Sequence, residues 1–496
     1  MNRTCWFALA ILLLGTGLRT AAFVSDRSLW IDEAMVALNI VERSPARLLE
    51  PLDRNQGAPV GFLLATKVSV TLFGPTERAL RLPAFLGSLV GLIATGFAAF
   101  RLLPRSAAHL AFALFAVSPH LVGYAAECKQ YSADAGFAAV LLAIAAPFFS
   151  GSVGSGRWFA FAGVGALSVW CSHPALFVLA GVGLALLSRA SIRRDRTRIL
   201  GLIALGGSWL LSFAAVYAVN LRHLGHNDYL LRYWTGHFAP RPTTRSGGVW
   251  YVDHALEFIR ESFGLTGDSR IAEGALGSVG LAGLLAMGRR SCLTQTATPG
   301  LLLAFALTLA LTLLASGVHL YPFAGRLLLF LIPMASIVWG AGARWLGSRL
   351  GRWGIALGWL ILVWPLLQSV DGIHEPRRAE EIRPLLNRIH SDWSPGDRIY
   401  VYGGSGDAGA GPAFDFYSPQ YDFPPGCVIR GGIHRDDPSK YSDEVSKLPP
   451  GRTWVLFTHR YRDEESRILA VFAERGAVES VMQVPGGSLH RFQLPP

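Results

Sequence analysis

The chain of 496 residues is hydrophobic and basic, with 51% hydrophobic and 16% charged residues, a mean hydropathy of +0.36 and a formal net charge of +11. Soluble domains carry roughly 25% charged residues, so this composition excludes a purely soluble protein and predicts a polytopic membrane protein with room for a soluble part. The arginines cluster in short gaps between apolar runs, as membrane topology requires, so their charge indicates no nucleic-acid partner. The 5 cysteines show no metal-binding spacing, and we expect no disulfide framework.

The first apolar segment follows Arg3 and begins at Trp6. It resembles a signal peptide, and an uncleaved first transmembrane helix is the other interpretation. In both, the chain reaches the outer side of the membrane near residue 24. Apolar stretches of about 20 residues each predict about eleven transmembrane helices. We expect these helices at 6–23, 80–100, 107–124, 132–149, 158–172, 174–188, 199–219, 274–288, 298–316, 325–343 and 353–370. Residues 172–174, Ser-His-Pro, predict the break within the long apolar run 158–188.

One further apolar segment, 60–74, decides the side on which every later loop lies. If it does not span and the N-terminus is cytoplasmic, the short arginine-rich loops lie inside, as the positive-inside rule predicts. Lys67 at its centre would cost about 2.5–3.5 kcal/mol at mid-bilayer. We therefore expect 60–74 to be an amphipathic helix at the outer interface. The outer loops are then 24–79, 124–131 and 220–273.

The tail, 371–496, differs in composition from the transmembrane part, 1–370. A helical pattern at 380–390 precedes a turn and strand at 395–402, and a buried-type strand at 452–458 precedes a helix at 463–474. This alternation predicts a small soluble α/β domain, which the same topology places outside the membrane.

An adjacent acid pair, Asp32-Glu33, opens a short amphipathic helical pattern in the first outer loop. Two carboxylates beside a membrane surface are candidate catalytic residues. In the alternative interpretation, Asp32 caps a helix and Glu33 complements its dipole. The local pattern does not decide between the catalytic and the capping interpretation.

The second outer loop continues the polar pattern. If it is helical, Glu127, Tyr131 and Asp134 share one face, and Lys129 lies beside them. Charged residues at the end of a transmembrane helix cost free energy unless they are paired or solvated. We therefore expect them to have a functional role. A cap at Ser132, with an acid at the start of the next span, would explain Asp134 alone.

Two arginines lie at the outer edge of predicted spans, Arg81 and Arg326. A guanidinium there suits a phosphate by its charge and planar fork; alternatively, Arg81 pairs with Glu77 and Arg326 snorkels. Acids facing one another beside basic residues at bilayer depth suit a lipid phosphate. Because an outer compartment supplies no nucleotide sugars, we expect a polyprenyl-phosphate-linked sugar as donor, with an acid that deprotonates an acceptor hydroxyl or orients a sugar.

Short motifs follow one another along residues 20–370. They are Leu29-Trp30-Ile31-Asp32-Glu33, Ala58-Pro59, Leu72-Phe73-Gly74, Arg81-Leu82-Pro83, Ser118-Pro119, the stretch from Glu127 to Asp134, and Tyr321-Pro322-Phe323-Ala324-Gly325-Arg326 with Pro333. In order and spacing the chain resembles the GT-C glycosyltransferases. It is similar to the family-39/83 branch, which includes protein O-mannosyltransferases, lipid A aminoarabinose transferases and bacterial galacturonic acid transferases.

The resemblance implies an all-α GT-C membrane fold and an inverting transfer by a hexosyl- or pentosyltransferase. The sugar would move from a polyprenyl phosphate to a glycan, lipid or protein at the outer face of the inner membrane. Asp32 matches the catalytic acid of the family, and Asp134 matches the aspartate of its second outer loop. We expect no cofactor, and a divalent ion, which some GT-C enzymes need, is not indicated.

One departure concerns the carrier phosphate. Aminoarabinose transferases have Glu-Lys-Pro before the interfacial helix, and its lysine helps to bind the carrier phosphate. This chain has Gly57-Ala58-Pro59 there, so another residue must contact the phosphate. The departure also argues against specificity for aminoarabinose. The predicted site therefore comprises the catalytic residues Asp32 and Glu33, the sugar- or acceptor-binding residues Glu127, Tyr131 and Asp134, and the carrier-phosphate-binding residues Lys129, Arg81, Arg326 and Lys67.

Two other function classes stay open as alternatives. A transporter or lipid flippase would need ionisable residues at mid-bilayer and repeats with broken helices, whereas the charges here lie at the outer edge. A glycan polymerase or ligase that uses lipid-linked oligosaccharide would share the outward-facing site.

Overall fold

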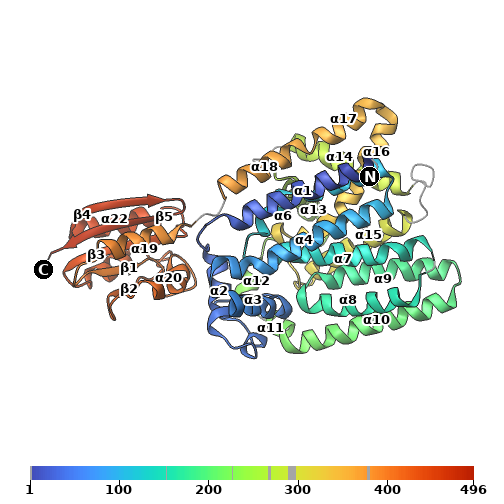
Figure 1. Ribbon diagram of the computed structural model, residues 1–496. Coiled ribbons are helices and arrows are strands. Elements are labelled where there is room, and N and C mark those ends of the chain that lie inside the picture. Colours follow the sequence, from blue (N-terminus) through green and yellow to red (C-terminus); the bar gives the residue numbers. More distant parts are fainter. Residues whose placement is uncertain are drawn as a thin grey trace.

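The computed structural model describes residues 3–151, 153–225, 227–265, 270–288, 298–376 and 380–495. A large bundle of helices holds the N-terminus, and a smaller part with the only sheet among the described residues holds the C-terminus (Figure 1). In the bundle, η marks 3-10 helices, apart from the π-helix η2. Its elements are α1 (Arg3–Val24), α2 (Ile31–Glu42), η1 (Arg47–Leu49), α3 (Val60–Phe73), α4 (Glu77–Leu102), α5 (Arg105–Ala116), α6 (Pro119–Tyr124), α7 (Tyr131–Ser150), α8 (Ser155–Cys171), α9 (Ala175–Ile192), α10 (Arg196–Val216), η2 (Tyr217–Leu221), α11 (Arg222–Leu224), α12 (Asp228–Tyr233), α13 (Arg245–Phe263), α14 (Arg270–Gly288), α15 (Thr298–Gly317), η3 (Gly325–Leu331), α16 (Ile332–Leu350), α17 (Arg352–Leu360) and α18 (Val363–His374).

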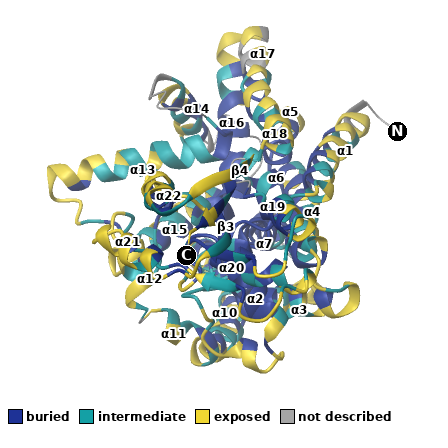
Figure 2. Cartoon of the chain, turned by 90° about the vertical axis from the view of Figure 1, so that its left-hand side faces the viewer, coloured by how far each residue is buried: buried dark blue, intermediate teal, exposed yellow. Residues whose placement is uncertain are grey.

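Seven helices in the described ranges are long and apolar enough to cross a membrane. Their large apolar side chains are exposed on the outer faces of α1, α4 and α10, whereas α7 and α16 are buried within the bundle (Figure 2). An apolar exterior around a buried helix suits a lipid environment. The candidate spans are Cys5–Val24, Glu77–Leu102, Tyr131–Phe149, Ala175–Ile192, Arg196–Leu224, Pro299–Gly317 and Gly325–Leu350.

The other four predicted spans are helical but shorter or broken. The segment 107–124 divides into α5 and α6 before Pro119, and 353–370 divides into α17 and α18. Helix α8 has 17 residues, and the apolar part of α14 is Ala272–Leu285. The total of about eleven spans at ~20 residues each therefore stays a prediction.

Two other sequence predictions concern single segments. The break at residues 172–174 is confirmed, because α8 ends at Cys171 and α9 begins at Ala175. The segment 60–74 is helical, as α3 (Val60–Phe73), and is shorter than the candidate spans. Its location at the outer interface stays a prediction.

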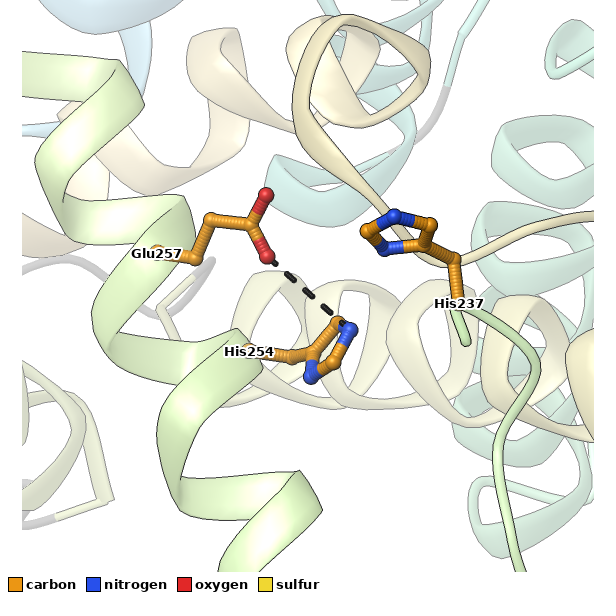
Figure 3. A group of neighbouring side chains, drawn as sticks. All are labelled: His237, His254 and Glu257. Atoms are coloured by element: carbon orange, nitrogen blue, oxygen red, sulfur yellow. Dashed lines mark ion pairs between the residues drawn. The ribbon is translucent and has the colours of Figure 1, made fainter. Parts of the chain in front are cut away.

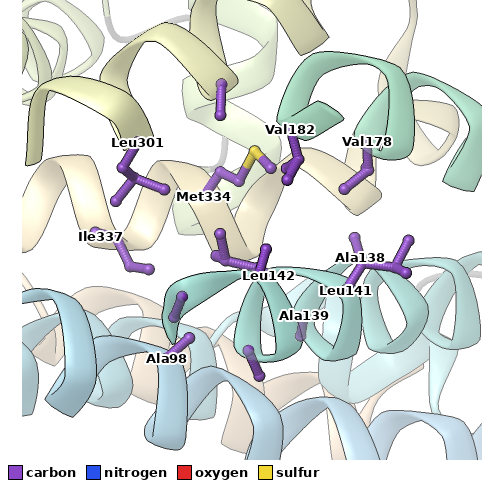
Figure 4. Packing of buried hydrophobic residues seen from close by; sticks show 14 of the residues in the cluster. Ala98, Ala138, Ala139, Leu141, Leu142, Val178, Val182, Leu301, Met334 and Ile337 are labelled. Carbon is purple, nitrogen blue, oxygen red and sulfur yellow. The ribbon is translucent and has the colours of Figure 1, made fainter. Parts of the chain in front are cut away.

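Small residues bring α4 and α7 together. A Cβ atom added at Gly136 would lie 2.3 Å from the carbonyl oxygen of Gly87, and one added at Gly91 would lie 2.7 Å from Gly136 Cα. Such close backbone approach is typical of helix pairs in membranes. Further along α7, Ala138, Ala139 and Leu142 pack among α4, α9 and α16 (Figure 4). This contact fixes α7, whose first turn carries Tyr131 and Asp134.

The C-terminal part is built on a five-stranded sheet in the order β2-β1-β3-β5-β4. Strand β1 is parallel to β2 and β3, whereas β5 is antiparallel to β3 and β4. The predicted helices and strands at 380–390, 395–402, 452–458 and 463–474 are confirmed as α19, β1, β3 and α22. The full set is α19 (Ile382–Ser391), β1 (Arg398–Val401), α20 (Gly411–Tyr417), η4 (Ser418–Gln420), β2 (Val428–Arg430), α21 (Ser439–Ser446), β3 (Gly451–Thr458), α22 (Glu464–Arg475), β4 (Ala477–Val484) and β5 (Gly487–Leu494).

The sheet domain contacts the first outer loop directly. One hydrophobic cluster contains residues of α2, α3 and the start of α4 together with residues of α19, α20, β1 and β3. Arg54 lies at the edge of this contact and forms an ion pair of 2.8 Å with Asp415. The Tyr417 hydroxyl accepts a hydrogen bond from Leu29 N, 2.9 Å away. The C-terminal part therefore supports the segment that leads into Asp32.

Candidate active site

Helix α2 begins at Ile31, so Asp32 lies in its first turn, as the amphipathic pattern predicts. The N-cap position is Trp30, whose side chain makes no capping hydrogen bond. Instead, the Ile31 N–H group donates to the Glu380 carboxylate, 3.0 Å away. The alternative prediction that Asp32 caps this helix is therefore wrong, because a carboxylate from beyond α18 fills that role and leaves Asp32 for another contact.

Asp32 forms an ion pair with Arg326, in which Arg326 Nη1 lies 2.8 Å from Asp32 Oδ2. The guanidinium carbon lies 5.3 Å from the ring centroid of Tyr131 and 5.9 Å from that of Trp30, within the range of a cation–π contact. The two aromatic rings thus orient Arg326. The Asp32 side chain keeps 23% of its surface exposed, so the pair is open to a ligand.

The second outer loop supplies further polar groups around this pair. Trp30 Nε1 donates to Glu127 Oε2 at 3.3 Å, and Lys129 Nζ donates to Gln56 Oε1 at 2.9 Å. Burial lowers the pKa of the Lys129 ammonium, and the carboxylate of Asp32 is the first of the charges that oppose this shift. The structure therefore brings Glu127, Lys129 and Tyr131 to Asp32 and Arg326. The helical face expected to join Glu127, Tyr131 and Asp134 is not formed, because α7 begins only at Tyr131.

Glu33 and Arg81 form a separate buried ion pair. Arg81 Nε and Nη2 each lie 2.9 Å from one oxygen of the Glu33 carboxylate, and Cys128 N donates to the same carboxylate at 2.7 Å. Burial alone would raise the pKa of Glu33, but the Arg81 guanidinium more than offsets it, so this pKa is lowered. The pair joins α2, α4 and the second outer loop.

Among the described residues, two other predicted residues form no hydrogen bond or ion pair with this group. Lys67 Nζ donates to the carbonyl groups of Ile40 and Val41, at 2.8 and 3.1 Å. These carbonyls lie near the C-terminal end of α2, opposite Asp32, about 12 Å away at 1.5 Å per residue. Asp134 is buried one turn into α7, and its Oδ1 has no hydrogen-bond partner among the described residues.

The large outer loop also reaches the site. Asn227 Nδ2 donates to Asn55 Oδ1 at 3.3 Å, so the start of α12 contacts the first outer loop. Burial raises the pKa of Tyr229 in α12, and the charges of Asp407 and Asp32 add to the shift. Helix α12 therefore begins against the first outer loop, which carries Asp32.

Sequence reasoning missed Gln56 and Glu380 as supporting residues. Gln56 immediately precedes Gly57-Ala58-Pro59, the stretch where the family pattern departs from Glu-Lys-Pro, and that departure was the available signal. Glu380 belongs to the start of the predicted 380–390 helix, and no local pattern indicates which distant helix it caps.

Neither a protein-family model nor a curated protein sequence matches the chain. Solved structures do match. The oligosaccharyltransferase of Archaeoglobus fulgidus in complex with zinc and sulfate has a TM-score of 0.51 at 12% identity, covering 98% of this chain and 72% of that chain. The same enzyme tethered to an acceptor peptide has a TM-score of 0.51 at 10% identity, covering 98% and 74%. The chain has the GT-C fold.

ArnT of Cupriavidus metallidurans, another GT-C protein, matches with a TM-score of 0.44 at 15% identity, over 99% of this chain and 98% of that chain. The GT-C fold is the fold that the resemblance drawn from Asp32-Glu33 and the later motifs implies. At such identities the likeness concerns the fold, so the roles of single residues rest on the geometry above.

Proposed function

We propose that the protein is an inverting membrane glycosyltransferase. It transfers a hexosyl or pentosyl group from a polyprenyl-phosphate donor to a glycan, lipid or protein acceptor at the outer face of the inner membrane. The observation that carries the proposal is the partly exposed ion pair between Asp32 and Arg326, bordered by buried Glu127, Lys129 and Tyr131. It combines a candidate base with cations for a phosphate leaving group.

Each part of this group has a task in the reaction. The Asp32 carboxylate accepts the proton of the acceptor hydroxyl as its oxygen attacks the anomeric carbon. The bond from that carbon to the phosphate oxygen breaks, and the lipid phosphate leaves with the electron pair. Arg326 presents a planar fork and Lys129 an ammonium to the developing phosphate charge.

The remaining predicted residues bind or support. Glu127, Tyr131 and Asp134 hold the sugar and acceptor. The other three have structural partners: Glu33 pairs with Arg81, and Lys67 bonds to carbonyls of α2. In the proposed enzyme they fix α2, so the carrier phosphate is held by Lys129 and Arg326.

The proposal includes a topology. Residues 1–370 form the transmembrane catalytic domain with about eleven spans of ~20 residues. Residues 371–496 form an extracytoplasmic α/β domain that supports the first outer loop. The contact between α20 and α2 supports this arrangement, since both elements then lie on one side of the membrane. No metal or other cofactor takes part in transfer.

A second candidate is transfer of a preassembled oligosaccharide. The likeness to an oligosaccharyltransferase favours it, at the level of fold. The lipid extract of a deletion strain separates the two. Accumulated monosaccharide-lipid supports the first function, and accumulated oligosaccharide-lipid supports the second. The GT-C fold gives no support to a transporter or flippase.

The direct test uses membranes supplied with a lipid-linked sugar. Asp32→Asn and Asp134→Asn are compared with the wild type and with Glu474→Gln, which changes an exposed carboxylate on α22. We expect Asp32→Asn to lower the rate of transfer by roughly 10²–10⁴, Asp134→Asn to reduce it less and Glu474→Gln to retain it. Full transfer by both aspartate variants would overturn the proposal.

A further inference from the structure

Three potential metal ligands converge beside α13, outside the group around Asp32. His254 and Glu257 lie on α13, and His237 lies in the loop before it (Figure 3). One ligand atom from each residue lies within 4.8 Å of the other two. Within the described ranges, this is the one group of at least three such residues with that spacing.

Hydrogen bonds leave two imidazole nitrogens free to bind a ligand. His254 Nδ1 lies 3.0 Å from the carbonyl oxygen of Trp250, which can only accept, so this nitrogen carries the proton. His254 Nε2 then presents its lone pair, and within the described part of the chain both this atom and His237 Nδ1 are buried without a hydrogen-bond partner. An imidazole oriented by a carbonyl through its second nitrogen is typical of metal-binding histidines.

An ordinary His–Glu ion pair does not account for this arrangement. His254 Nε2 lies 3.9 Å from Glu257 Oε2, which is beyond hydrogen-bond distance. Leaving buried nitrogens unpaired costs roughly 1–3 kcal/mol each. Ligand atoms around tetrahedral zinc lie about 3.3 Å apart at bond lengths near 2.0–2.1 Å, so small side-chain rotations bring these three atoms onto one ion.

The surroundings hold the ligands in place and leave room for a fourth. The Trp250 ring stacks on His254 with centroids 3.9 Å apart, and the His237 ring meets His254 edge-on at 5.7 Å. A cavity of about 330 Å³ adjoins His254 and Glu257. It gives access to an ion and space for a bound water.

We propose that His237, His254 and Glu257 form a zinc site that fixes the large outer loop. Two imidazoles and one carboxylate form a ligand set that Zn²⁺ accepts, and they leave the fourth tetrahedral position to water. Magnesium and calcium prefer oxygen ligands and fit this set poorly.

The site is connected to Arg326 through the backbone. The His237 carbonyl accepts a hydrogen bond of 2.8 Å from Phe323 N, three residues before Arg326 in the chain. The rings of Trp250 and Phe323 also meet, with centroids 6.1 Å apart. Zinc bound at His237 therefore holds the segment that presents Arg326. This link rests on the proposed function, whereas zinc binding itself does not.

Zinc titration of the purified full-length protein tests the site without any substrate. After removal of metals with a chelator, we expect one tightly bound Zn²⁺ per chain, and the visible absorption of Co²⁺ in its place reports histidine ligands. His254→Ala and Glu257→Gln should weaken binding at least tenfold. The matched control is His223→Ala, which removes another histidine of the same loop. Zinc should raise the Tm of the wild type and of His223→Ala, and leave that of His254→Ala unchanged.

Two outcomes would overturn the proposal. Failure of the wild-type protein to bind stoichiometric zinc at micromolar concentration removes the site, and equal binding by His254→Ala, Glu257→Gln and wild type removes these ligands. The donor KM then tests the link to Arg326: a well-folded His254→Ala protein that has lost zinc and keeps the wild-type KM overturns that link. Because zinc binding is measured without a donor, its failure is distinguishable from failure of the glycosyltransferase proposal.

Discussion

Arg326 Nη1 lies 2.8 Å from Asp32 Oδ2, and this ion pair joins η3 to the first turn of α2. The rings of Trp30 and Tyr131 flank the guanidinium. Both charged side chains are only partly buried, in contrast to the Glu33–Arg81 pair. An arginine in this position can move from the carboxylate to an incoming phosphate and leave Asp32 free to act as a base.

The first prediction follows from the shape of the guanidinium. Arg326→Lys keeps the charge but loses the planar fork, so we expect the donor kcat/KM to fall at least tenfold, about 1.4 kcal/mol. Asp32→Asn should lower kcat by roughly 10²–10⁴, the usual contribution of a general base. Arg349→Lys, at an exposed position near the end of α16, is the matched control. Steady-state kinetics in membranes measure these effects, and equal losses in the control and Arg326→Lys would contradict the assignment.

The second prediction concerns the buried pair of Glu33 and Arg81. Breaking a buried ion pair from one side typically destabilises by about 3–5 kcal/mol, because the remaining charge loses its partner. Glu33→Gln should therefore lower the Tm clearly, whereas Asp32→Asn should change it little. Thermal unfolding of the two purified variants in detergent gives the comparison. A larger Tm loss for Asp32→Asn than for Glu33→Gln would exclude the structural role given to Glu33.

The same pair predicts a pH dependence. Since the pKa of Glu33 in the folded protein lies below its usual value of 4.5, its contribution to stability is present above pH 4.5. That contribution is lost as the pH falls through the lowered pKa. The Tm difference between wild type and Glu33→Gln should therefore shrink on acidification below pH 4.5. A Tm difference that grows below pH 4.5 would contradict the lowered pKa of Glu33.

The third prediction concerns the cap of α2. Glu380 accepts the hydrogen bond of Ile31 N, and Glu381 accepts from Ser28 N and Ser28 Oγ at 3.1 and 2.9 Å. Glu380→Ala should cost about 0.5–2 kcal/mol of local stability, as the loss of an N-cap does. We expect faster amide hydrogen exchange at the start of α2 and a lower kcat. Glu474→Ala, which changes an exposed carboxylate of α22, should change neither. Unchanged exchange in Glu380→Ala would show that the cap does not hold α2.

Much of the fold could be predicted from sequence because it depends on local patterns. Continuous apolar runs, the Ser-His-Pro break at 172–174 and the alternation around 452–458 identify their elements. The strands β4 and β5 were missed, although they form a hairpin closed at Gly486, whose φ is 69°. Their alternation is weak, since Val478 and Val481 are exposed and break the pattern that a half-buried strand would show.

The site could be predicted only in part, because pairings depend on tertiary contacts. The sequence identified Asp32, Glu33, Arg81 and Arg326, yet spacing alone could not assign Arg326 to Asp32 and Arg81 to Glu33. The i−4 neighbour of Arg81, Glu77, was the alternative partner to a phosphate, and in the structure it accepts from the Tyr417 hydroxyl instead. Competition among several carboxylates within reach is decided by burial, which the sequence does not encode locally.

The last prediction uses the lowered pKa of Lys129. Burial lowers it, and the charge of Arg326 lowers it further, whereas the carboxylates of Asp32 and Glu127 oppose the shift. As the pH rises through this lowered pKa, the ammonium loses its charge and its attraction for the donor phosphate. The wild-type donor KM should therefore begin to rise at a pH below the ordinary lysine value of 10.5. Lys129→Arg keeps its charge throughout this range, because a guanidinium does not titrate there, and should abolish that rise. Lys447→Arg, at an exposed position after α21, is the control and should keep the wild-type profile. An identical alkaline rise in Lys129→Arg and wild type would mean that another group governs phosphate binding.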